Sequence, residues 1–356
     1  MVSIIGADSP GHAGHTEKIM KNALSRFFLA IALLFLSSLS FVPYGALAAD
    51  KVIGIYASQA ISQSLPWIAE EAGLFRKYNL DFQLIYVASA GISTAALLGG
   101  DADIALTGGA GVVRAFVGGA ADLVVIGAVK NILTHSILAG QKIRNADGLK
   151  GKKIGVTRIG SNSHYFTIQA LRYSGLDPDR DVTFVQTGGV PENLAALVKG
   201  MIDAATMTSP GDAKAISQGF HYVVYGPDLR IPYANTIFAT RRPEIAKRPD
   251  VVGRFMRAMA EAAKILHTDK ELTYKVLRKQ FRIDDRKLLD AAYNPEIKVL
   301  ESRLDIKPES IQAILNEVSQ IDPRAKKVKP QDMMDIRYLD EMQKSGFLEK
   351  LWGKQS

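Results

Sequence analysis

The sequence predicts an α/β protein built from two similar lobes, each a mostly parallel sheet flanked by helices. Three observations lead to this prediction: residues 95–125 resemble residues 195–225, strands alternate with helices in both copies, and small polar residues follow the strands. The two copies share Ala95/Ala195, Ala96/Ala196, Leu97/Leu197, Gly100/Gly200, Asp103/Asp203, Ala105/Ala205, Gly111/Gly211, Ala115/Ala215, Gly119/Gly219 and Val124/Val224. A solenoid stacks several repeats, so two copies are better interpreted as two lobes that face one another.

The first 48 residues have the features of a secretory signal peptide. The apolar run Phe27–Val42 follows Lys21 and Arg26 and precedes the small residues around Ala48. These are the charged, apolar and cleavage regions of such a peptide, so we expect cleavage after Ala48. An uncleaved membrane anchor is the alternative, but the run is shorter than the roughly 20 residues that a span needs. Residues 1–19 are polar and unpatterned, which is consistent with a true start at Met20.

Composition narrows the class of protein further. The chain has 356 residues, 47% of them hydrophobic and 22% charged, as in ordinary globular proteins with room for two domains. The net charge of +8 is spread out, and its densest cluster, 324–329, lacks the aromatic residues of a nucleic-acid interface. The chain has no cysteine, which excludes disulfides, thiolate metal sites, a cysteine nucleophile and a lipoprotein anchor. No catalytic or metal-binding motif is present, so we expect neither an enzyme nor a cofactor.

Taken in order, the first copy alternates strands and helices as a parallel sheet covered on both faces requires. The first helix begins near Pro66, a residue suited to a first helical turn, and ends at Gly73, a favourable residue after a last turn. The expected strands are 51–56, 82–87, 104–106 and 123–129, and the expected helices are 66–73, 92–98 and 112–117.

The second copy repeats this order. Its expected strands are 153–157, 182–186, 203–207 and 222–225, and its expected helices are 163–173, 192–198 and 211–217. Two further extended segments, 134–139 and 234–240, are expected to cross between the lobes and to form the hinge.

Beyond Pro243 the pattern is helical only. Val252, Phe255, Met259 and Leu266 lie at helical spacing in the first of these segments. Further helices are expected at 269–280, 286–292, 309–319 and 331–344. These helices have no strand partners, so they should pack on the first lobe. That lobe would comprise residues 49–136 and 236–356, with residues 137–235 forming the second lobe.

The polar loops are the candidate ligand site. Ligands of open parallel sheets bind beyond the carboxyl ends of the strands, where helix N-termini offer unpaired N–H groups and a partial positive charge. Helix caps and turns use the same residue types, so a single loop is weak evidence, whereas equivalent loops in two copies are stronger. The candidate ligand-binding residues are Ser58, Gln59, Ser89, Gly91, Thr107, Gly108, Arg158, Ser161, Asn162, Ser163, Thr187, Gly188 and Ser209.

Arg158 is the one full charge in these loops. It precedes the Gly-Ser-Asn-Ser turn that opens the first helix of the second lobe. Its forked donors could clamp an anion there, although an arginine at a strand end can equally well point into solvent. The loops favour an anionic or strongly hydrogen-bond-accepting ligand, and a neutral ligand that offers hydroxyls or amides stays open. His164 and Trp67 are better explained by helix structure and packing.

Six segments of the chain are informative when they are taken together: the signal peptide, Trp67-Ile-Ala-Glu-Glu-Ala-Gly-Leu-Phe, Leu97-Leu-Gly-Gly-Asp-Ala-Asp-Ile-Ala, Leu149-Lys-Gly-Lys-Lys-Ile-Gly-Val, Arg158-Ile-Gly-Ser and Lys344-Ser-Gly-Phe. As a set they resemble periplasmic substrate-binding proteins of ABC importers, in the group that takes up nitrate, sulfonates, taurine and thiamine-pyrimidine precursors. The resemblance covers essentially all of residues 50–350. It implies a two-lobed type II periplasmic-binding fold that closes on its ligand.

The resemblance also implies a function. We expect a monomer in the periplasm that captures a small solute, with a sulfonate-, carboxylate- or nitrate-like anion favoured, and delivers it to an importer permease and its ATPase. Two alternatives stay open: binding or synthesis of a thiamine-pyrimidine precursor, and ligand sensing for a membrane receptor. The enzyme of this family that makes the pyrimidine depends on a cysteine-rich motif, and this chain has no cysteine.

Overall fold

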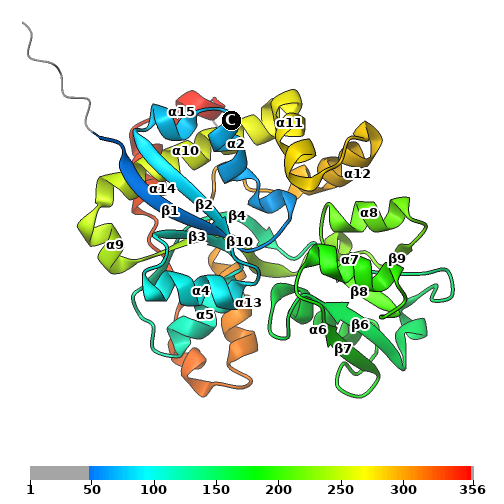
Figure 1. The fold of residues 1–356 in the computed structure, drawn as a ribbon. Helices are drawn as coiled ribbons and strands as arrows, with labels where there is room; N and C mark the ends of the chain where they lie inside the picture. Colours follow the sequence, from blue (N-terminus) through cyan, green and yellow to red (C-terminus); the bar gives the residue numbers. More distant parts are fainter. Residues whose placement is uncertain (1–47, 354–356) are drawn as a thin grey trace, which may run out of the picture. The chain divides into compact units, whose positions relative to one another are not determined.

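Two five-stranded sheets organise the protein in the computed structural model, which describes residues 48–353 (Figure 1). Sheet A has the strand order β2-β1-β3-β10-β4, and sheet B has the order β7-β6-β8-β5-β9. In each sheet one strand, β10 or β5, runs antiparallel to both of its neighbours. The two orders correspond strand for strand, which confirms the α/β fold of two similar lobes. We call sheet A with the helices packed on it the first lobe, and sheet B with its helices the second.

The strands agree with the predicted ones to within about three residues at each end. The strands of sheet A are β1 (Asp50–Tyr56), β2 (Leu80–Tyr86), β3 (Ile104–Thr107), β4 (Leu123–Ile132) and β10 (Pro232–Arg241). The strands of sheet B are β5 (Ser136–Ala139), β6 (Lys152–Val156), β7 (Val182–Gln186), β8 (Ala204–Met207) and β9 (His221–Val224).

The helices between these strands flank the sheets, and the later helices follow β10. Those of the first copy are α2 (Leu65–Glu71), α3 (Leu74–Lys77), α4 (Ala90–Gly99) and α5 (Gly109–Val117). Those of the second copy are α6 (Asn162–Tyr173), α7 (Val190–Val198) and α8 (Gly211–Ser217). The later helices are α9 (Arg242–Lys247), α10 (Pro249–Thr268), α11 (Lys270–Phe281), α12 (Arg286–Glu296), α13 (Pro308–Val318), α14 (Arg337–Lys344) and α15 (Phe347–Trp352). Short 3-10 helices are η1 (Ile61–Gln63), η2 (Ala146–Leu149), η3 (Gly226–Leu229), η4 (Ile297–Val299), η5 (Pro323–Lys327) and η6 (Pro330–Met333).

The two segments expected to cross between the lobes are each a strand of one sheet. β5 lies between β8 and β9 in sheet B, and β10 lies between β3 and β4 in sheet A. The crossing itself is made by the connections 133–135 and 225–231. Each lobe therefore receives its antiparallel strand from outside its own copy. The predicted boundaries 136/137 and 235/236 stay predictions, because contacts join the chain from Ala49 onward in one compact unit.

The C-terminal helices pack mainly on the first lobe, as predicted. α10 packs on α2 and α3, and α13 packs on β10 and α5. α12 also contacts α8 of the second lobe, which the sequence did not indicate. The expected helix 331–344 is interrupted between η6 and α14, because Met334 forms a bridge with Val125 and the Asp335 N–H donates to the Val125 carbonyl. None of the described helices is both long and apolar enough to cross a membrane. The predicted signal peptide lies outside the described residues.

The aspartates repeated in the two copies perform the same structural task. Asp103 Oδ2 accepts the Ile53 N–H at 2.8 Å, and Asp203 Oδ2 accepts the Lys153 N–H at 2.8 Å. Each carboxylate thus joins the turn before the third strand of its copy to the first strand. The identity of these two aspartates in both copies therefore has a structural explanation.

We expect Asp103→Ala to destabilise the protein more than Asp203→Ala. Asp103 also pairs with the Arg248 guanidinium at 2.8 Å, whereas the Asp203 hydrogen bond is exposed. Losing a charge-assisted bond and its partner costs about 2–3 kcal/mol, and losing the exposed bond costs about 1 kcal/mol. Urea unfolding of both variants checks the difference. Equal losses would show that the Arg248 contact contributes nothing.

Candidate functional site

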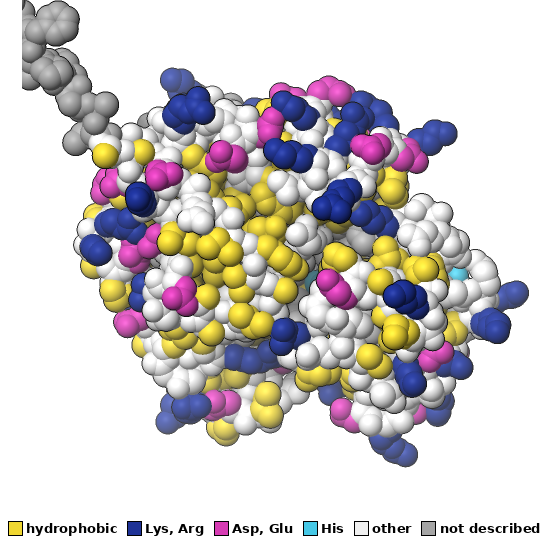
Figure 2. All heavy atoms as spheres, viewed as in Figure 1, with side chains coloured by type: hydrophobic (Ala, Val, Ile, Leu, Met, Phe, Trp, Pro, Cys, Tyr) yellow, Lys and Arg dark blue, Asp and Glu magenta, His cyan; other side chains and the backbone are white. Residues whose placement is uncertain are grey.

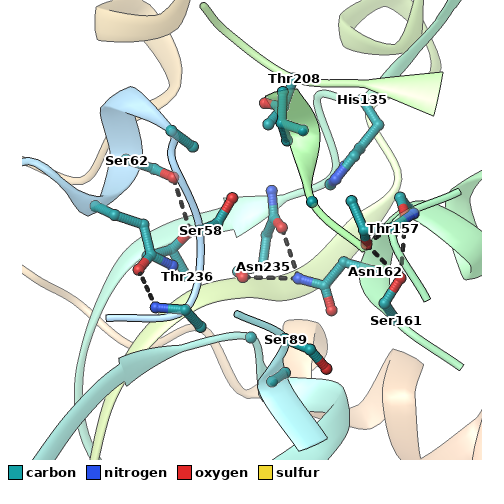
Figure 3. Close-up of a pocket in the computed structure, with 18 of the residues that line it drawn as sticks. Ser58, Ser62, Ser89, His135, Thr157, Ser161, Asn162, Thr208, Asn235 and Thr236 are labelled. Atoms are coloured by element: carbon teal, nitrogen blue, oxygen red, sulfur yellow. Dashed lines mark hydrogen bonds between the residues drawn. The ribbon is translucent and has the colours of Figure 1, made fainter. Parts of the chain in front are cut away.

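The candidate site is a pocket between the two lobes, at the carboxyl ends of their parallel strands. Figure 3 shows polar side chains from both lobes pointing toward one another across it. The pocket, called the inner pocket below, is lined by Ala57, Ser58, Ala60, Ser62, Gln63, Tyr86, Ser89, Ala90, Gly108, Lys130, His135, Thr157, Ser161, Asn162, Ser163, Gly188, Gly189, Val190, Thr208, Asn235 and Thr236. Its volume is about 70 Å³. A water needs roughly 10–15 Å³ on this measure, so the pocket has room for a handful of waters or a small chemical group.

Four helices begin at this pocket, two from each lobe. They are α4, α5, α6 and α7, and the first residue or the N-cap residue of each appears in the lining. No described side chain accepts a hydrogen bond as the N-terminal cap of any of them. The first N–H groups of a helix have no partner within the helix and carry part of the positive end of its dipole. The inner pocket therefore offers N–H donors and a positive potential from both sides.

Ser89 holds an unusual backbone conformation at the pocket wall. It precedes α4 with φ of 87°, a value that favours glycine and is uncommon for serine. Such strain persists where the surrounding structure imposes it, and it is concentrated at binding and catalytic sites. Ser89 is the N-cap residue of α4, yet its hydroxyl does not cap that helix. The hydroxyl is thus available to a ligand.

Asn162 joins the two lobes across the pocket. Its Nδ2 donates to the carbonyl and to the side-chain oxygen of Asn235, each at 2.8 Å (Figure 3). Asn235 lies on β10 of sheet A, whereas Asn162 begins α6 of the second lobe. Gly108 makes this contact possible, because a Cβ at that position would lie 2.8 Å from Asn162 Nδ2. A second cross-lobe bond runs from the Ile61 N–H to the Ser209 carbonyl at 3.2 Å.

The charges at the inner pocket are compensated. Lys130 is 1% exposed, and its Nζ lies 2.5 Å from Oε1 of the buried Glu296 and 2.7 Å from Thr134 Oγ1. Burial, reinforced by the Lys130 charge, lowers the pKa of His135 to about 3, so its imidazole is neutral at physiological pH. Among the described residues that line the pocket, Lys130 is the one with a formal charge. Recognition of a ligand there would therefore depend on dipoles and neutral hydrogen-bonding groups.

Three buried polar atoms of the lining have no hydrogen-bond partner among the described residues. They are Oγ1 of Thr208, Nδ1 of His135 and Oδ1 of Asn162. Thr208 is 5% exposed and His135 is 8% exposed, so neither residue has much access to bulk solvent. A buried polar group without a partner costs about 1–3 kcal/mol. A bound solute or ordered water that hydrogen-bonds these groups would recover that cost.

The inner pocket brings together part of the predicted site. The predicted residues in its lining are Ser58, Ser89, Gly108, Ser161, Asn162, Ser163 and Gly188. Ser161 and Ser163 hydrogen-bond to each other at 2.9 Å and to Thr157 Oγ1 at 3.0 and 2.9 Å. These three hydroxyls form one cluster at the start of α6.

The structure places the other predicted residues outside the lining. Gln59 donates to the Tyr56 hydroxyl at 3.2 Å, and the buried Thr107 shares a hydrogen bond of 2.6 Å with Ser93. Thr187 donates to the Val156 carbonyl at 3.1 Å, and Ser209 donates to the Ala292 carbonyl at 2.8 Å. These side chains are engaged with the protein itself, as caps and turns commonly are.

Two further predicted residues also lie apart from the pocket. Gly91 is exposed in the first turn of α4. Arg158 is absent from the lining although Ser161, three residues later, belongs to it. The anion clamp predicted for Arg158 stays a prediction, which the lining of this pocket does not support.

Several lining residues were missed from the sequence. Lys130 and His135 could have been noticed in the sequence, because both are polar residues within the long, mostly apolar run from Leu123 to Ala139. Lysine is almost never fully buried unless it is paired, so a lysine in a buried strand indicates a partner and often a site. The place of Asn235 and Thr236 in the pocket could not be predicted in this way, because β10 reaches the pocket only when the whole chain has folded. Within residues 48–353, no group of His, Asp and Glu side chains is arranged to hold a metal ion.

The fold and the pocket define a two-lobed protein of the periplasmic-binding architecture. The structure is similar to that of the alkanesulfonate-binding protein SsuA from Xanthomonas axonopodis pv. citri bound to MOPS, with a TM-score of 0.67, 19% identity, and coverage of 82% of this chain and 100% of that one. The desulfurization enzyme DszB shares the fold at a TM-score of 0.62 and 12% identity, over 83% of this chain and 99% of that one. Identities this low establish the fold alone.

The chain belongs to the NMT1/THI5 like family, whose model matches residues 65–271. A protein of Brucella abortus (strain 2308), named as a binding protein, is 28% identical over 277 residues, which cover 76% of this chain and 82% of the relative. The family and the fold confirm the resemblance predicted from the sequence.

Proposed function

We propose that this protein captures a small anionic or strongly hydrogen-bond-accepting solute in the periplasm and delivers it to an ABC importer. The observation that carries the proposal is the convergence of four uncapped helix N-termini, two from each lobe, on one pocket with buried unpartnered polar groups. A helix N-terminus is a ready-made anion site. The similarity to an alkanesulfonate-binding protein supports a sulfonate as the bound group.

The charge balance of the pocket is consistent with a compact anion held by dipoles. Lys130 is already paired with Glu296, and His135 is neutral, so neither adds a free positive charge. In a site of low dielectric, aligned N–H donors stabilise an anion without a counter-charge. A neutral solute with several acceptors would use the same donors and is the alternative.

We propose binding without turnover, since the similarity to binding proteins outweighs the more distant similarity to an enzyme. A thermal-shift screen over sulfonates, aromatic carboxylates, nitrate, bicarbonate and pyrimidines would find the solute, because a ligand that binds only the folded state raises the melting temperature. Mass spectrometry of the solute after incubation with the protein would then distinguish binding from catalysis. Stoichiometric survival of the solute supports binding, and its catalytic loss would contradict it.

We expect Asn162→Ala to weaken binding of the solute found in the screen by about thirtyfold or more. The variant loses two cross-lobe hydrogen bonds to Asn235 and one polar group of the pocket. Two to three net hydrogen bonds are worth about 2–3 kcal/mol. Isothermal titration calorimetry measures the change directly.

Two further variants sharpen this test. Asn162→Asp keeps the shape but adds a negative charge, so it should abolish binding of an anion and weaken binding of a neutral solute far less. Arg158→Ala should stay within about threefold of wild type, because Arg158 does not line the pocket. If Arg158→Ala instead costs the tenfold to hundredfold of a lost charge-assisted bond, the arginine clamp predicted from the sequence holds the ligand.

A further inference from the structure

Arg114 connects the two lobes although it does not line the inner pocket. It belongs to α5 of the first lobe, and its guanidinium donates a hydrogen bond to the Gly160 carbonyl, in the turn before α6 of the second lobe. A second nitrogen of the same guanidinium lies 2.5 Å from Oε1 of Glu317, on α13 of the first lobe. Arg114 is thus anchored by an ion pair within its own lobe and reaches the other lobe with one hydrogen bond.

Glu317 is held in position through both of its oxygens. Oε1 pairs with Arg114, and Oε2 accepts a hydrogen bond of 2.9 Å from the hydroxyl of Tyr233, a fully buried residue of β10. Burial raises the pKa of Glu317, and the Arg114 charge and the Tyr233 hydroxyl oppose this rise. The carboxylate therefore has a fixed orientation, and it directs the guanidinium fork of Arg114 toward the second lobe.

Gly160 is the point at which the second lobe receives this contact. Its N–H donates to Nδ1 of His164 at 3.1 Å and its carbonyl accepts from Arg114, so both of its backbone polar groups have partners. Its φ of 79° favours glycine, and an added Cβ would lie 3.0 Å from Nη1 of Arg114. The next three residues, 161–163, line the inner pocket. The bond from Arg114 therefore holds the turn that brings the hydroxyl and amide groups of α6 to the pocket.

Other contacts between the lobes accompany this bond. Near Arg114, the ring of Tyr165 on α6 stacks on that of Tyr233 with the centroids 4.7 Å apart. On the α8 side, Lys214 Nζ donates to the Phe281 carbonyl at the end of α11 at 2.8 Å. Figure 1 shows α5 and α6 in the lower part of the view and α8 and α12 in the upper part, and Figure 2 shows Lys and Arg side chains on the rim of the hollow between the lobes. We call the arrangement in which these contacts are made the closed arrangement.

The bond to Gly160 exists only in the closed arrangement. Binding proteins of two lobes open by rigid-body rotation about a hinge. Such opening would break the bond to Gly160 and leave the pair with Glu317 intact, because Arg114 and Glu317 belong to the same lobe. A hydrogen bond from a charged donor changes an equilibrium by roughly tenfold to a hundredfold. The bond therefore favours the closed arrangement by about that factor.

We propose that Arg114 is a positioning residue for solute capture, which stabilises the closed arrangement and holds the α6 turn in place without touching the solute. This inference rests on the proposed function and adds to it how the pocket retains what it has bound. The step that Arg114 controls is release, because the solute leaves only after the bond to Gly160 has broken. Its effect should therefore be the same for every solute that the pocket accepts.

Spin labels on the two lobes test the effect on closure without a solute. The chain has no cysteine, so Met201→Cys in the second lobe and Ile321→Cys in the first supply its only thiols, both at exposed positions. Pulsed electron paramagnetic resonance then gives the distribution of distances between the two labels. Arg114→Met combined with Glu317→Gln removes the guanidinium, leaves no unpaired carboxylate and keeps an acceptor for Tyr233. This double variant should lower the ratio of closed to open molecules about tenfold or more.

Two single variants calibrate this result. Arg114→Lys keeps the charge beside Glu317 but lacks the planar fork, so it should recover part of the lost ratio. Arg172→Lys, at an exposed position of α6, is the matched control and should leave the ratio at the wild-type value.

Stopped-flow kinetics with methanesulfonate as the probe test the consequence for capture. The double variant should raise the dissociation rate constant about tenfold or more and change the association rate constant less than threefold, because the bond to Gly160 forms only as the lobes close. A merely structural role predicts the opposite pattern, in which urea unfolding shows lower stability while the distances and rate constants stay at their wild-type values.

The outcomes separate this proposal from the proposed function. A wild-type distance distribution in the double variant overturns the role of Arg114, and so does a wild-type dissociation rate constant. If methanesulfonate binds to neither protein, the sulfonate in the proposed function is wrong, and the ratio of closed to open molecules alone decides on Arg114.

Discussion

Replacing Lys130 by methionine is expected to lower the free energy of unfolding by about 3–5 kcal/mol. Lys130 and Glu296 are 1% and 4% exposed and form an ion pair of 2.5 Å. Removing the lysine leaves the carboxylate enclosed, with the Thr134 hydroxyl at 3.3 Å as its remaining hydrogen-bond donor among the described residues. An uncompensated buried charge is one of the few single changes that costs this much.

A double variant separates the cost of the orphaned charge from the value of the pair. Lys130→Met with Glu296→Leu should recover most of the stability, because replacing both members of a buried pair by apolar residues is often neutral or stabilising. Urea unfolding of the wild type, both single variants and the double variant forms the required cycle. If the double variant is as unstable as Lys130→Met, the loss comes from packing and not from the charge.

The deficit of Lys130→Met should also depend on pH, through Asp212. Burial raises the pKa of Asp212 to about 6, the Glu296 carboxylate adds to this rise, and the Lys130 charge opposes it. An unfolded aspartate releases its proton near pH 4, whereas Asp212 of the folded protein keeps its proton up to about pH 6. The free energy of unfolding therefore falls as the pH rises between these two values. Without the Lys130 charge the pKa of Asp212 in the folded protein rises further, so this loss of stability continues to a higher pH. The stability difference between wild type and Lys130→Met should therefore be larger at pH 7.5 than at pH 5.

Much of the fold could be predicted because the sequence is locally consistent. The repeat of one hundred positions preserves Asp103 and Asp203, which make the same bond to the first strand of each copy. Apolar runs and glycines located most strands and helices to within a few residues. Sheet order was harder to predict, since β5 and β10 join sheets through contacts distant in sequence that no local pattern encodes.

The site could be predicted only in part, for a physical reason. Sequence position identifies which loops lie at the carboxyl ends of strands, so Ser58, Ser89 and the start of α6 were found. It does not tell which side of a turn faces the pocket, so the role predicted for Arg158, which lies outside the lining, stays a prediction. Asn235 belongs to β10, and only the antiparallel return of that strand brings it to Asn162.

The second large effect is expected at Gly226, where the two connections between the lobes touch. Its N–H donates to Ser136 Oγ at 3.1 Å, and a Cβ at this position would lie 1.5 Å from the His135 carbonyl oxygen. That atom belongs to the backbone of the other connection and cannot turn aside as a side chain could. Gly226→Ala must therefore separate the two connections or prevent their packing. We expect a loss of about 3–5 kcal/mol in unfolding free energy, at the upper end for an overpacked site.

The same substitution should weaken ligand binding even in the molecules that fold. His135 lines the inner pocket and adjoins β5, so a shift of its backbone moves one pocket wall and changes how the lobes meet. Gly140→Ala is the matched control, because a Cβ there would meet nothing within 4 Å and its backbone needs no left-handed conformation. That variant should be neutral or more stable by up to about 1 kcal/mol, since alanine restricts the unfolded chain. Urea unfolding and calorimetric titration of both variants check the prediction, and a Gly226→Ala protein with wild-type stability and affinity would show that the two connections are not packed against each other in solution.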